Sequence, residues 1–389
     1  MEKKILIVCF SQFDWDRTLF QRPQQVMLRL SKKHKILWIR PLSFRFLFKK
    51  KGPFGYEKNM RVNSNLQVFN PIMLPTLHAH LPFVGYINSF LLRFLIKRKI
   101  TKLQKAQNIF ILSWYYYPLY EELAGKIGDQ RIIYECMDEF AAFRDALSGM
   151  EKKDLRLLSK ADIVFVGGMR MYRRKKKFNS NIHFFPTGVE YDHFSSASDE
   201  NTKIPDDVRD LSHPILGYWG AVDERLDYRL LAYVAEKRPT WSIVLLGPLT
   251  KVKPKEVAFC LDLPNVHWLG PKKYGQLPHY GKAFDICLLP FVSTKEAENL
   301  NPTKTLEYLA MGSPCVSTAL DDIKELYAEV VSIAPNSEEF LKAVEDVLAH
   351  DSPEKREARK KFARGKSWEA MVDGMEKIVL QSCNLGKLS

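Results

Sequence analysis

The sequence lacks the short motifs that mark several large classes of enzyme. No GxGxxG follows a strand-like run, which disfavours a dinucleotide-dependent oxidoreductase, and the absence of GxxxxGK followed by Ser or Thr excludes a P-loop NTPase. No GxSxG is present either, which excludes the nucleophile elbow of the α/β-hydrolases.

Cysteines and long apolar runs are also scarce. The six cysteines show no CxxC pair and no Cys/His spacing typical of structural zinc, so we expect reduced, buried thiols in a cytoplasmic protein. The N-terminal apolar stretch is too short for the core of a signal peptide. The longest apolar segment, residues 81–96, is interrupted by Asn88 and Arg93 and is shorter than the ~20 residues of a spanning helix. We therefore expect a soluble or peripheral protein.

What the chain has in excess is positive charge. Its 59 Lys and Arg outnumber 45 Asp and Glu, which gives a formal net charge of +14. Such an excess favours polyanionic partners, namely nucleic acid, an anionic membrane surface or phosphorylated ligands. The basic run RRKKK at 173–177 is the best argument for nucleic acid, but no recognition motif accompanies it, so we expect no nucleic acid to bind.

The length of 389 residues suits two α/β domains. Short β-branched runs alternate with longer helical patterns in both halves, which predicts parallel sheets with helices between the strands. A polar stretch over 195–210 separates the halves. The expected organisation is a first domain over 1–190, a linker over 191–211, a second domain over 212–365, and a crossover helix and tail over 366–389.

The most informative segment is 290–318, where a strand ends and a helix begins. Ligands of open α/β sheets bind outside the carboxyl ends of the strands, and a helix that starts there, as Pro302 indicates, attracts anions. Lys304 on the first turn can neutralise a diphosphate, and Glu307 shares its face and can accept the hydroxyls of a ribose. The alternative is a solvated Lys and Glu on a surface helix.

Residues 301–318, NPTKTLEYLAMGSPCVST, resemble the nucleotide-sugar-binding motif of bacterial GT-B glycosyltransferases, particularly those of exopolysaccharide and teichuronic-acid synthesis. Further segments resemble the same family in the same order: FQRPQQVMLRLSKKHKILWI (20–39), FPTGVEYDHF (185–194), GYWGAVDERLD (217–227) and NVHWLGPKKYGQLPHY (265–280). The resemblance implies an α/β fold of the GT-B kind, with two Rossmann-like domains whose parallel sheets face a central cleft. The first domain would bind the acceptor and the second the nucleotide sugar.

The expected donor-binding residues lie at strand ends of the second half. They are Gly220, Arg225, Gly247, Lys272, Tyr274, Asn301, Lys304 and Glu307. Gly220 permits close backbone approach, Arg225 can pair bidentately with a phosphate, and the backbone near Lys272 can read the base. A plain turn glycine, a solvated arginine and a solvated basic turn are the alternatives. The resemblance implies a UDP- or GDP-sugar as substrate. Because these cations supply the positive charge that a metal would otherwise provide, we expect no obligatory metal and no other cofactor.

One feature departs from the family pattern. Many retaining members carry two glutamates eight positions apart, whereas the position eight before Glu307 is Asn299, and Glu298 is one place off. The sequence therefore predicts neither the donor sugar nor whether the enzyme inverts or retains.

Acceptor-side candidates lie in the first half. Asp138 follows the strand-like run 132–136, where a carboxylate could deprotonate an acceptor hydroxyl, as an acidic base does in inverting GT-B enzymes. A helix N-cap ahead of Ala141 explains Asp138 equally well.

Further acceptor-side candidates are Asp14, Asp16, Arg22 and Gln24 in the first loop, and Trp114, whose ring would be an aromatic platform for a sugar. The Asp-x-Asp pair resembles the metal site of the other glycosyltransferase fold. It follows the first strand here instead of lying deep inside a single domain, so we expect no metal there.

The function expected from these observations is transfer of a sugar to a lipid-linked or polysaccharide acceptor in cell-surface polysaccharide synthesis. The alternatives are a sugar-nucleotide 2-epimerase on the same fold and a non-enzymatic basic binding module.

Two segments, 44–54 (FRFLFKKKGPF) and 83–98, favour peripheral attachment to the inner, anionic face of the cell membrane. A helix over 83–98 would place on one broad face Phe83, Ile87, Phe90, Leu91, Phe94 and Leu95. A core-facing amphipathic helix beside a solvated loop is the alternative.

Overall fold

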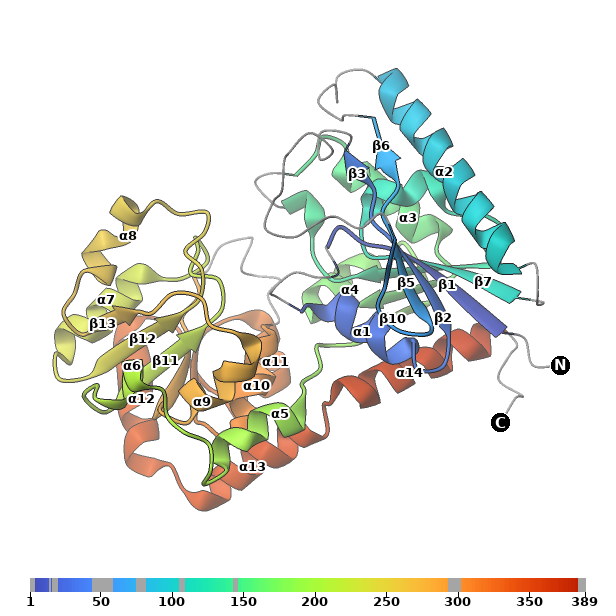
Figure 1. Ribbon diagram of the computed structural model, residues 1–389. Coiled ribbons are helices and arrows are strands. Elements are labelled where there is room, and N and C mark those ends of the chain that lie inside the picture. The colour runs from blue at the N-terminus through green and yellow to red at the C-terminus, as the bar shows by residue number, and fades with distance from the viewer. Residues whose placement is uncertain are drawn as a thin grey trace. The chain divides into compact units, whose positions relative to one another are not determined.

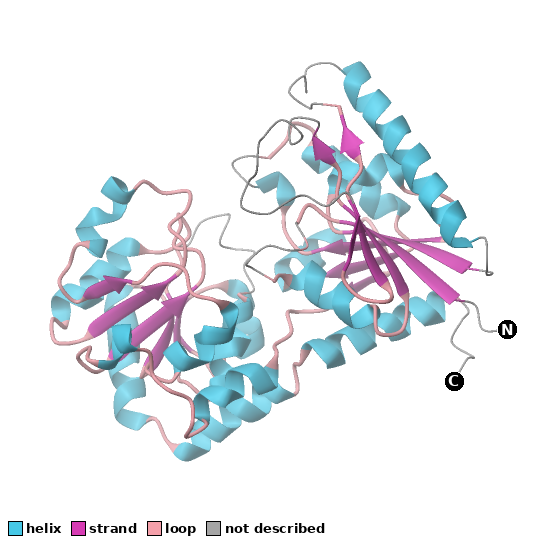
Figure 2. Cartoon of the chain, viewed as in Figure 1, coloured by secondary structure: helices cyan, strands magenta, loops and turns pink. Residues whose placement is uncertain are grey.

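The computed structural model describes residues 4–13, 15, 20–43, 59–74, 82–104, 109–142, 146–292 and 302–383. The chain forms two compact units (Figure 1): the first comprises Met1–Phe185 and Val372–Ser389, and the second comprises Pro186–Met371. Each unit has its own sheet, with helices on both faces of it (Figure 2).

The sheet of the first unit has the order β10-β9-β8-β7-β1-β2-β5-β4 within the described residues. Its pairs are parallel except β4 with β5. The strands are β1 (Lys4–Phe10), β2 (Lys35–Ile39), β4 (Asn59–Arg61), β5 (Leu66–Phe69), β7 (Ile109–Tyr115), β8 (Arg131–Cys136), β9 (Ile163–Val166) and β10 (Ile182–Phe184). A separate pair consists of β3 (Leu42–Ser43) and β6 (Ile72–Met73).

Helices cover both faces of this sheet. They are α1 (Arg22–Leu30), α2 (Pro82–Gln104), α3 (Met150–Lys160) and α4 (Met169–Lys175), with the 3₁₀ turns η3 (Pro118–Leu123) and η4 (Phe140–Ala142). Leu6, Val8 and Phe10 of β1 share one core with Ile96 of α2 and Leu157 of α3. Because β1 lies inside the sheet and is covered on both faces, its sequence is an apolar run instead of an alternating pattern.

The sheet of the second unit has the order β13-β12-β11-β14-β15-β16 and is parallel throughout. Its strands are β11 (Ile215–Trp219), β12 (Ser242–Leu246), β13 (Val266–Trp268), β14 (Ile286–Leu289), β15 (Cys315–Thr318) and β16 (Ser332–Ala334). Strand order reverses between β11 and β14, and such a switch point is where open α/β sheets bind ligands.

The helices of the second unit alternate with its strands. They are α7 (Tyr228–Lys237), α8 (Pro254–Leu261), α9 (Leu277–Gly281), α10 (Thr303–Met311), α11 (Asp321–Tyr327), α12 (Ser337–His350) and α13 (Pro353–Arg364), with the 3₁₀ turn η6 (Tyr274–Gln276). The predicted α/β class, with two Rossmann-like units, is confirmed.

The segment 191–211, expected as a linker, packs on the second unit. It forms α5 (Tyr191–Ser195), η5 (Ser196–Ser198) and α6 (Asp206–Arg209). Phe194, Ala197 and Val208 join the core of that unit. The composition of the segment is polar because few of its side chains face this core.

The last helix, α14 (Trp368–Ser382), belongs to both units. It begins in the second unit, and its residues from Val372 onward belong to the first. Met375 is buried, and the Glu376 carboxylate lies 2.6 Å from both His34 Nε2 and Lys33 Nζ. None of the described helices combines the length and the apolar character that crossing a bilayer requires.

Candidate functional site

Two neighbouring strands of the second unit are each followed by a glycine, so no side chain occupies these two positions. Gly220 follows β11 with a φ of 137°, and Gly247 follows β12 with a φ of 149°. The Gly220 amide donates to the Leu246 carbonyl at 2.9 Å, and a Cβ on Gly247 would lie 1.7 Å from the Gly220 carbonyl oxygen. Both positions therefore favour glycine, and they leave bare backbone at the carboxyl ends of β11 and β12, of which β11 borders the switch point.

Lys304 lies against this bare backbone. A Cβ on Gly220 would come within 2.8 Å of its Cε. Its ammonium is 5.2 Å from the centre of the Tyr218 ring and 5.3 Å from that of the Phe291 ring. Burial lowers the pKa of Lys304, and the charge of Arg225 lowers it further. A half-buried cation on the first turn of a helix, beside a strand end without side chains, is suited to bind a phosphate.

Glu307 is buried one turn further along α10. Its Oε2 accepts a hydrogen bond of 2.6 Å from the indole of Trp219, whose backbone N–H donates to the Tyr308 hydroxyl at 3.1 Å. Burial raises the pKa of Glu307, whereas the indole N–H and the Lys304 charge oppose that rise. Lys304 and Glu307 therefore lie near enough to influence each other's charge, as their spacing predicts.

Arg225 is oriented by a carboxylate two residues earlier in the chain. Its Nε lies 3.0 Å from Asp223 Oδ1 and its Nη2 lies 2.6 Å from Asp223 Oδ2. Asp223 is buried, whereas the Arg225 side chain is 37% exposed. Arg225 therefore presents a fixed, partly accessible cation after β11, within electrostatic reach of Lys304.

Lys272 and Tyr274 are engaged in holding the segment α5–α6. Lys272 Nζ lies 2.7 Å from Asp207 Oδ2, and the Tyr274 ring stacks on His193 with 4.8 Å between centroids. Their side chains support the loop after β13, whose backbone was the part expected to read a base. Asn301 lies outside the described residues.

The turn that follows β10 also reaches α10. The Thr187 hydroxyl donates to the Thr303 hydroxyl at 3.2 Å. Glu190, three residues later, contributes to the raised pKa of Glu307 through its negative charge. Residues 187–190 are therefore part of this site, although sequence reasoning used them only as a family marker.

In the first unit, Asp138 lies two residues beyond β8 and is half-buried. The Cys136 thiol is 3.5 Å from the backbone carbonyl oxygen of Asp138, and η4 begins at Phe140. This place after a strand is compatible with either expected role, an acceptor base or a cap.

The side chains of Arg22, Gln24 and Trp114 make hydrogen bonds within the first unit. Arg22 Nε lies 2.6 Å from Glu135 Oε1, and the Trp114 indole donates to Glu135 Oε2 at 2.9 Å. The Gln24 side chain accepts from the Gln21 backbone at 3.0 Å, which caps α1. Trp114 is only 1% exposed, so its ring does not present a platform to a sugar in this structure.

The remaining acceptor-side candidates, Asp14 and Asp16, lie outside the described residues. Within the part of the chain that the structure describes, no three His, Cys, Asp or Glu side chains gather at one point. The basic run 173–177 is partly internal, because Lys175 is buried, pairs with Asp154 and lies 3.6 Å from Glu139.

The fold is shared with solved glycosyltransferases. A sucrose-phosphate synthase from Thermosynechococcus elongatus is 14% identical and superposes with a TM-score of 0.71, covering 98% of this chain and 100% of that one. An α,α-trehalose-phosphate synthase (UDP-forming) from Burkholderia xenovorans, solved with glucose-6-phosphate, is 10% identical with a TM-score of 0.66, covering 97% of this chain and 100% of that one.

The sequence comparisons name the same class. Residues 213–350 match the family model of Glycosyl transferases group 1. Over 277 residues the chain is 27% identical to TuaH of Bacillus subtilis (strain 168), a protein provisionally assigned as a teichuronic acid biosynthesis glycosyltransferase, covering 66% of this chain and 69% of that protein. The chain is a GT-B glycosyltransferase.

The matched region of the glycosyltransferase contains the described cluster on α10 and after β11. Gly220, Arg225, Gly247, Lys304 and Glu307 all fall within residues 213–350, whereas every acceptor-side candidate precedes it.

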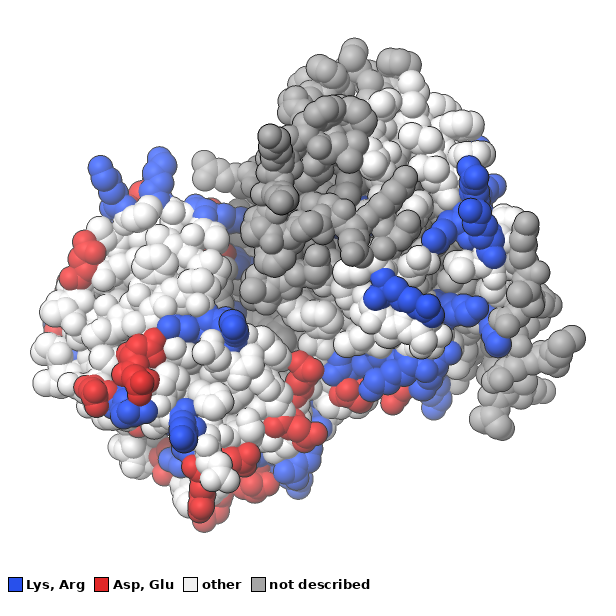
Figure 3. Space-filling model, viewed as in Figure 1, with Lys and Arg blue, Asp and Glu red and all other residues white. Residues whose placement is uncertain are grey.

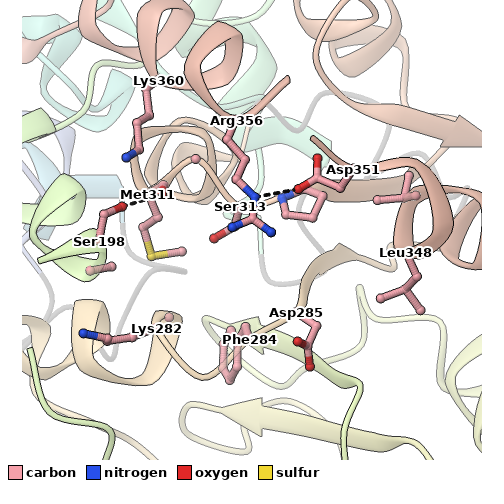
Figure 4. A pocket seen from close by; sticks show the side chains of 15 residues that line it. Ser198, Lys282, Phe284, Asp285, Met311, Ser313, Leu348, Asp351, Arg356 and Lys360 are labelled. Carbon is pink, nitrogen blue, oxygen red and sulfur yellow. Dashed lines mark hydrogen bonds and ion pairs between the residues drawn. The ribbon is translucent and has the colours of Figure 1, made fainter. Parts of the chain in front are cut away.

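The second unit of the glycosyltransferase also contains a cavity of about 500 Å³ (Figure 4). Its lining shares no residue with the cluster around Lys304. Its lining includes Lys282, Asp285 and Lys360, together with Arg356, which lies 2.9 Å from Asp351. The cavity borders the amino ends of β14 and β15, whereas the cluster around Lys304 lies at carboxyl ends of strands. It is therefore not the candidate donor site.

Sequence reasoning missed Trp219 and Asp223 as site residues. Both lie within the segment 217–227 that carries the family resemblance. A carboxylate two residues before Arg225 was a readable signal for a local ion pair. The bond from Trp219 to Glu307 was not readable, because it joins residues 88 positions apart.

Proposed function

We propose that the glycosyltransferase moves a sugar from a UDP- or GDP-sugar to a lipid-linked or polysaccharide acceptor in cell-surface polysaccharide synthesis. The observation that carries the donor half of this proposal is the Lys304 ammonium beside the strand end at Gly220. The acceptor half is supported by the likeness to TuaH, whose description names teichuronic acid biosynthesis.

The diphosphate would occupy the space at the start of α10. Negative charge grows on a nucleoside diphosphate as the sugar leaves, and fixed cations stabilise that charge in the transition state. Lys304 is held by aromatic rings and Arg225 by Asp223, so both are oriented before the donor arrives. With two cations and a helix N-terminus available, the proposed reaction requires no metal ion and no further cofactor.

Glu307 would hold the ribose of the donor. A carboxylate has two oxygens with several acceptor positions, and the Trp219 indole binds to Oε2. The remaining positions can accept ribose hydroxyls, which would replace the solvation that burial removes. Binding of the ribose and of the diphosphate would then use side chains one turn apart on the same helix.

Asp138 would act on the acceptor if the enzyme inverts the anomeric centre. A carboxylate after β8 would take the proton of the attacking hydroxyl as the new glycosidic bond forms and the bond to the diphosphate breaks. A retaining enzyme that reacts on one face of the sugar needs no such base.

The test is a donor screen with the purified full-length protein. UDP- and GDP-sugars are incubated with lipid-diphosphate-linked and oligosaccharide acceptors, with EDTA or with Mg²⁺, and the anomers of the product are read by NMR. A new glycosidic bond formed in EDTA supports the proposal. Turnover only with Mg²⁺ contradicts metal independence, and conversion of the donor to its epimer without an acceptor contradicts transfer.

A further inference from the structure

Helix α2 of the first unit is apolar on two faces. Leu92, Ile96 and Ile100, spaced four residues apart, are each at most 5% exposed and pack in the core of that unit. Leu91 and Leu95 lean on the same core. This face satisfies the ordinary role of an amphipathic helix, so the core does not account for the apolar residues elsewhere on α2.

The second face carries an exposed aromatic stripe. Tyr86, Phe90 and Phe94, again spaced by four, are 80%, 62% and 53% exposed. With Ile87 they make up four of the nine large exposed hydrophobic residues in the described chain, and all four lie within three turns of one helix. Single exposed apolar residues are ordinary, but a contiguous stripe of this kind indicates a surface that is covered in use.

This division corrects the face expected from the sequence. That face joined Phe90 and Phe94 to Leu91 and Leu95, whereas the structure exposes the two phenylalanines and turns the two leucines toward the core. The side chain of Phe83 and the segment 44–54 lie outside the described residues.

The charge along α2 has a single sign. Residues 82–104 contain five Lys and Arg and no Asp or Glu. Figure 3 shows Lys and Arg side chains gathered over the lower half of α2, with no acidic side chain among them. Lys97 and Arg98 are exposed one turn beyond Phe94, and the Arg93 guanidinium lies 5.7 Å from the centre of the Phe90 ring. Helical spacing places Arg93 beside the aromatic stripe and Arg98 at its end, four residues beyond Phe94.

An anionic lipid surface is the partner that suits both the exposed aromatic stripe and the positive charge of α2. Aromatic side chains enter the boundary between headgroups and acyl chains, and flanking Lys and Arg bind the headgroups. A second copy of the chain suits it less well, because a two-fold contact centred on Phe90 would bring Arg93, which lies beside that ring, close to its counterpart. We propose that α2 docks the first unit on an anionic membrane surface through Tyr86, Phe90 and Phe94, with Arg93, Lys97 and Arg98 on the headgroups.

Docking rests on α2 alone and not on the proposed donor chemistry, so the two can fail separately. The full-length protein is sedimented with vesicles of phosphatidylcholine, with and without phosphatidylglycerol. Binding is expected only with phosphatidylglycerol, and it should weaken with added salt. The triple variant Tyr86→Ser, Phe90→Ser, Phe94→Ser should bind at least about tenfold more weakly. Its unfolding midpoint should be unchanged, because Leu92, Ile96 and Ile100 remain.

The charges are tested by Arg93→Gln, Lys97→Gln, Arg98→Gln, which should weaken binding on the order of a hundredfold. The control for the aromatic variant is Phe259→Ser, and the control for the charge variant is the triple variant Lys255→Gln, Lys324→Gln, Lys361→Gln. Both alter exposed residues of the second unit and should not change vesicle binding. Equal loss in the controls, or no sedimentation with phosphatidylglycerol at low salt, would overturn the proposal. A dimer that the triple serine variant dissociates, without vesicle binding, would overturn it in favour of a second copy.

Discussion

The indole of Trp219 and the carboxylate of Glu307 are joined by a hydrogen bond of 2.6 Å that ties the end of β11 to α10. The backbone N–H of Trp219 also binds the Tyr308 hydroxyl, so consecutive residues of α10 are fastened to one residue of the strand. Lys304 precedes Glu307 by one turn of the same helix. The hydrogen bond between Trp219 and Glu307 therefore helps to position Lys304, the candidate phosphate-binding residue, although Lys304 takes no part in that bond.

Replacing Trp219 with phenylalanine tests this tie. Trp219→Phe keeps an aromatic ring but removes the N–H, which leaves Glu307 buried with one fewer donor. We expect a loss of about 1–3 kcal/mol in the free energy of unfolding, measured with urea. In a Glu307→Gln background the loss should be smaller, because a neutral amide is less costly to bury than a carboxylate. Equal losses in both backgrounds would show that the ring alone matters.

Removing the Lys304 ammonium should weaken the binding of a nucleoside diphosphate. For Lys304→Ala we expect a loss of about 1.5–3 kcal/mol in the binding free energy of UDP or GDP, which is the range for a hydrogen bond to a charged group. Calorimetry in EDTA measures it. Lys324→Ala, an exposed lysine on α11 of the same unit, is the control and should bind as the native protein does. Unchanged affinity in Lys304→Ala would remove this residue from the site.

A side chain at position 247 should disrupt the packing between the strand ends that follow β11 and β12. Gly247→Ala places a Cβ 1.7 Å from the carbonyl oxygen of Gly220 and also strains a φ of 149°. The strain alone costs on the order of 1–3 kcal/mol, and the clash requires the backbone to move. Thermal unfolding should show the loss, whereas Gly275→Ala, where no atom lies within 4 Å of the new Cβ, should change stability by less than about 0.5 kcal/mol. Equal stability of the two variants contradicts the close approach.

Replacing Asp138 tests whether the enzyme inverts or retains the anomeric configuration of the sugar. If the enzyme inverts, Asp138→Asn should lower kcat by about 10²–10⁴-fold while donor affinity stays the same, because the base acts only on the acceptor. Near-native turnover would reassign Asp138 to a structural cap. A retained anomeric configuration in the product would also remove the need for this base.

The attachment of α14 to the first unit should weaken in acid. Hydrogen bonds from His34 and Lys33 hold the pKa of Glu376 below its ordinary value of about 4.3. The carboxylate therefore stabilises the folded state fully above that ordinary value, and the contribution is lost as the pH falls through the lowered pKa. Hydrogen exchange of α14 amides between about pH 6 and pH 3 measures this, and Glu376→Gln should flatten the dependence. An identical acid dependence in that variant would locate the sensitive group elsewhere.

Most of the fold followed from patterns that act within one element. The start of α10 was predicted because Pro302 marks it, and buried strands such as β1 are continuous apolar runs. The two faces of α2 could not be told apart in this way, because apolar residues recur all around the helix and periodicity gives no direction toward the core.

The site residues that local sequence patterns mark could be predicted, whereas contacts between residues far apart in the sequence could not. Lys304 and Glu307 were found from a helix start after a strand, which local signals reveal. The contacts that Glu135 makes with Arg22 and Trp114 could not be predicted, because Glu135 lies 113 residues beyond Arg22 and no local pattern links them.

The return of the chain at Val372 has a consequence for recombination. Because Val372–Ser389 belong to the same unit as Met1–Phe185, the second unit is inserted within the sequence of the first, and the first is built from two separate stretches of chain. A fragment ending at Phe185 would lack the buried Met375 and the partner of His34, and would expose the apolar surface that they cover. Chimaeras that replace the second unit should therefore exchange residues 186–371 as one block and keep residues 372–389 with the first unit.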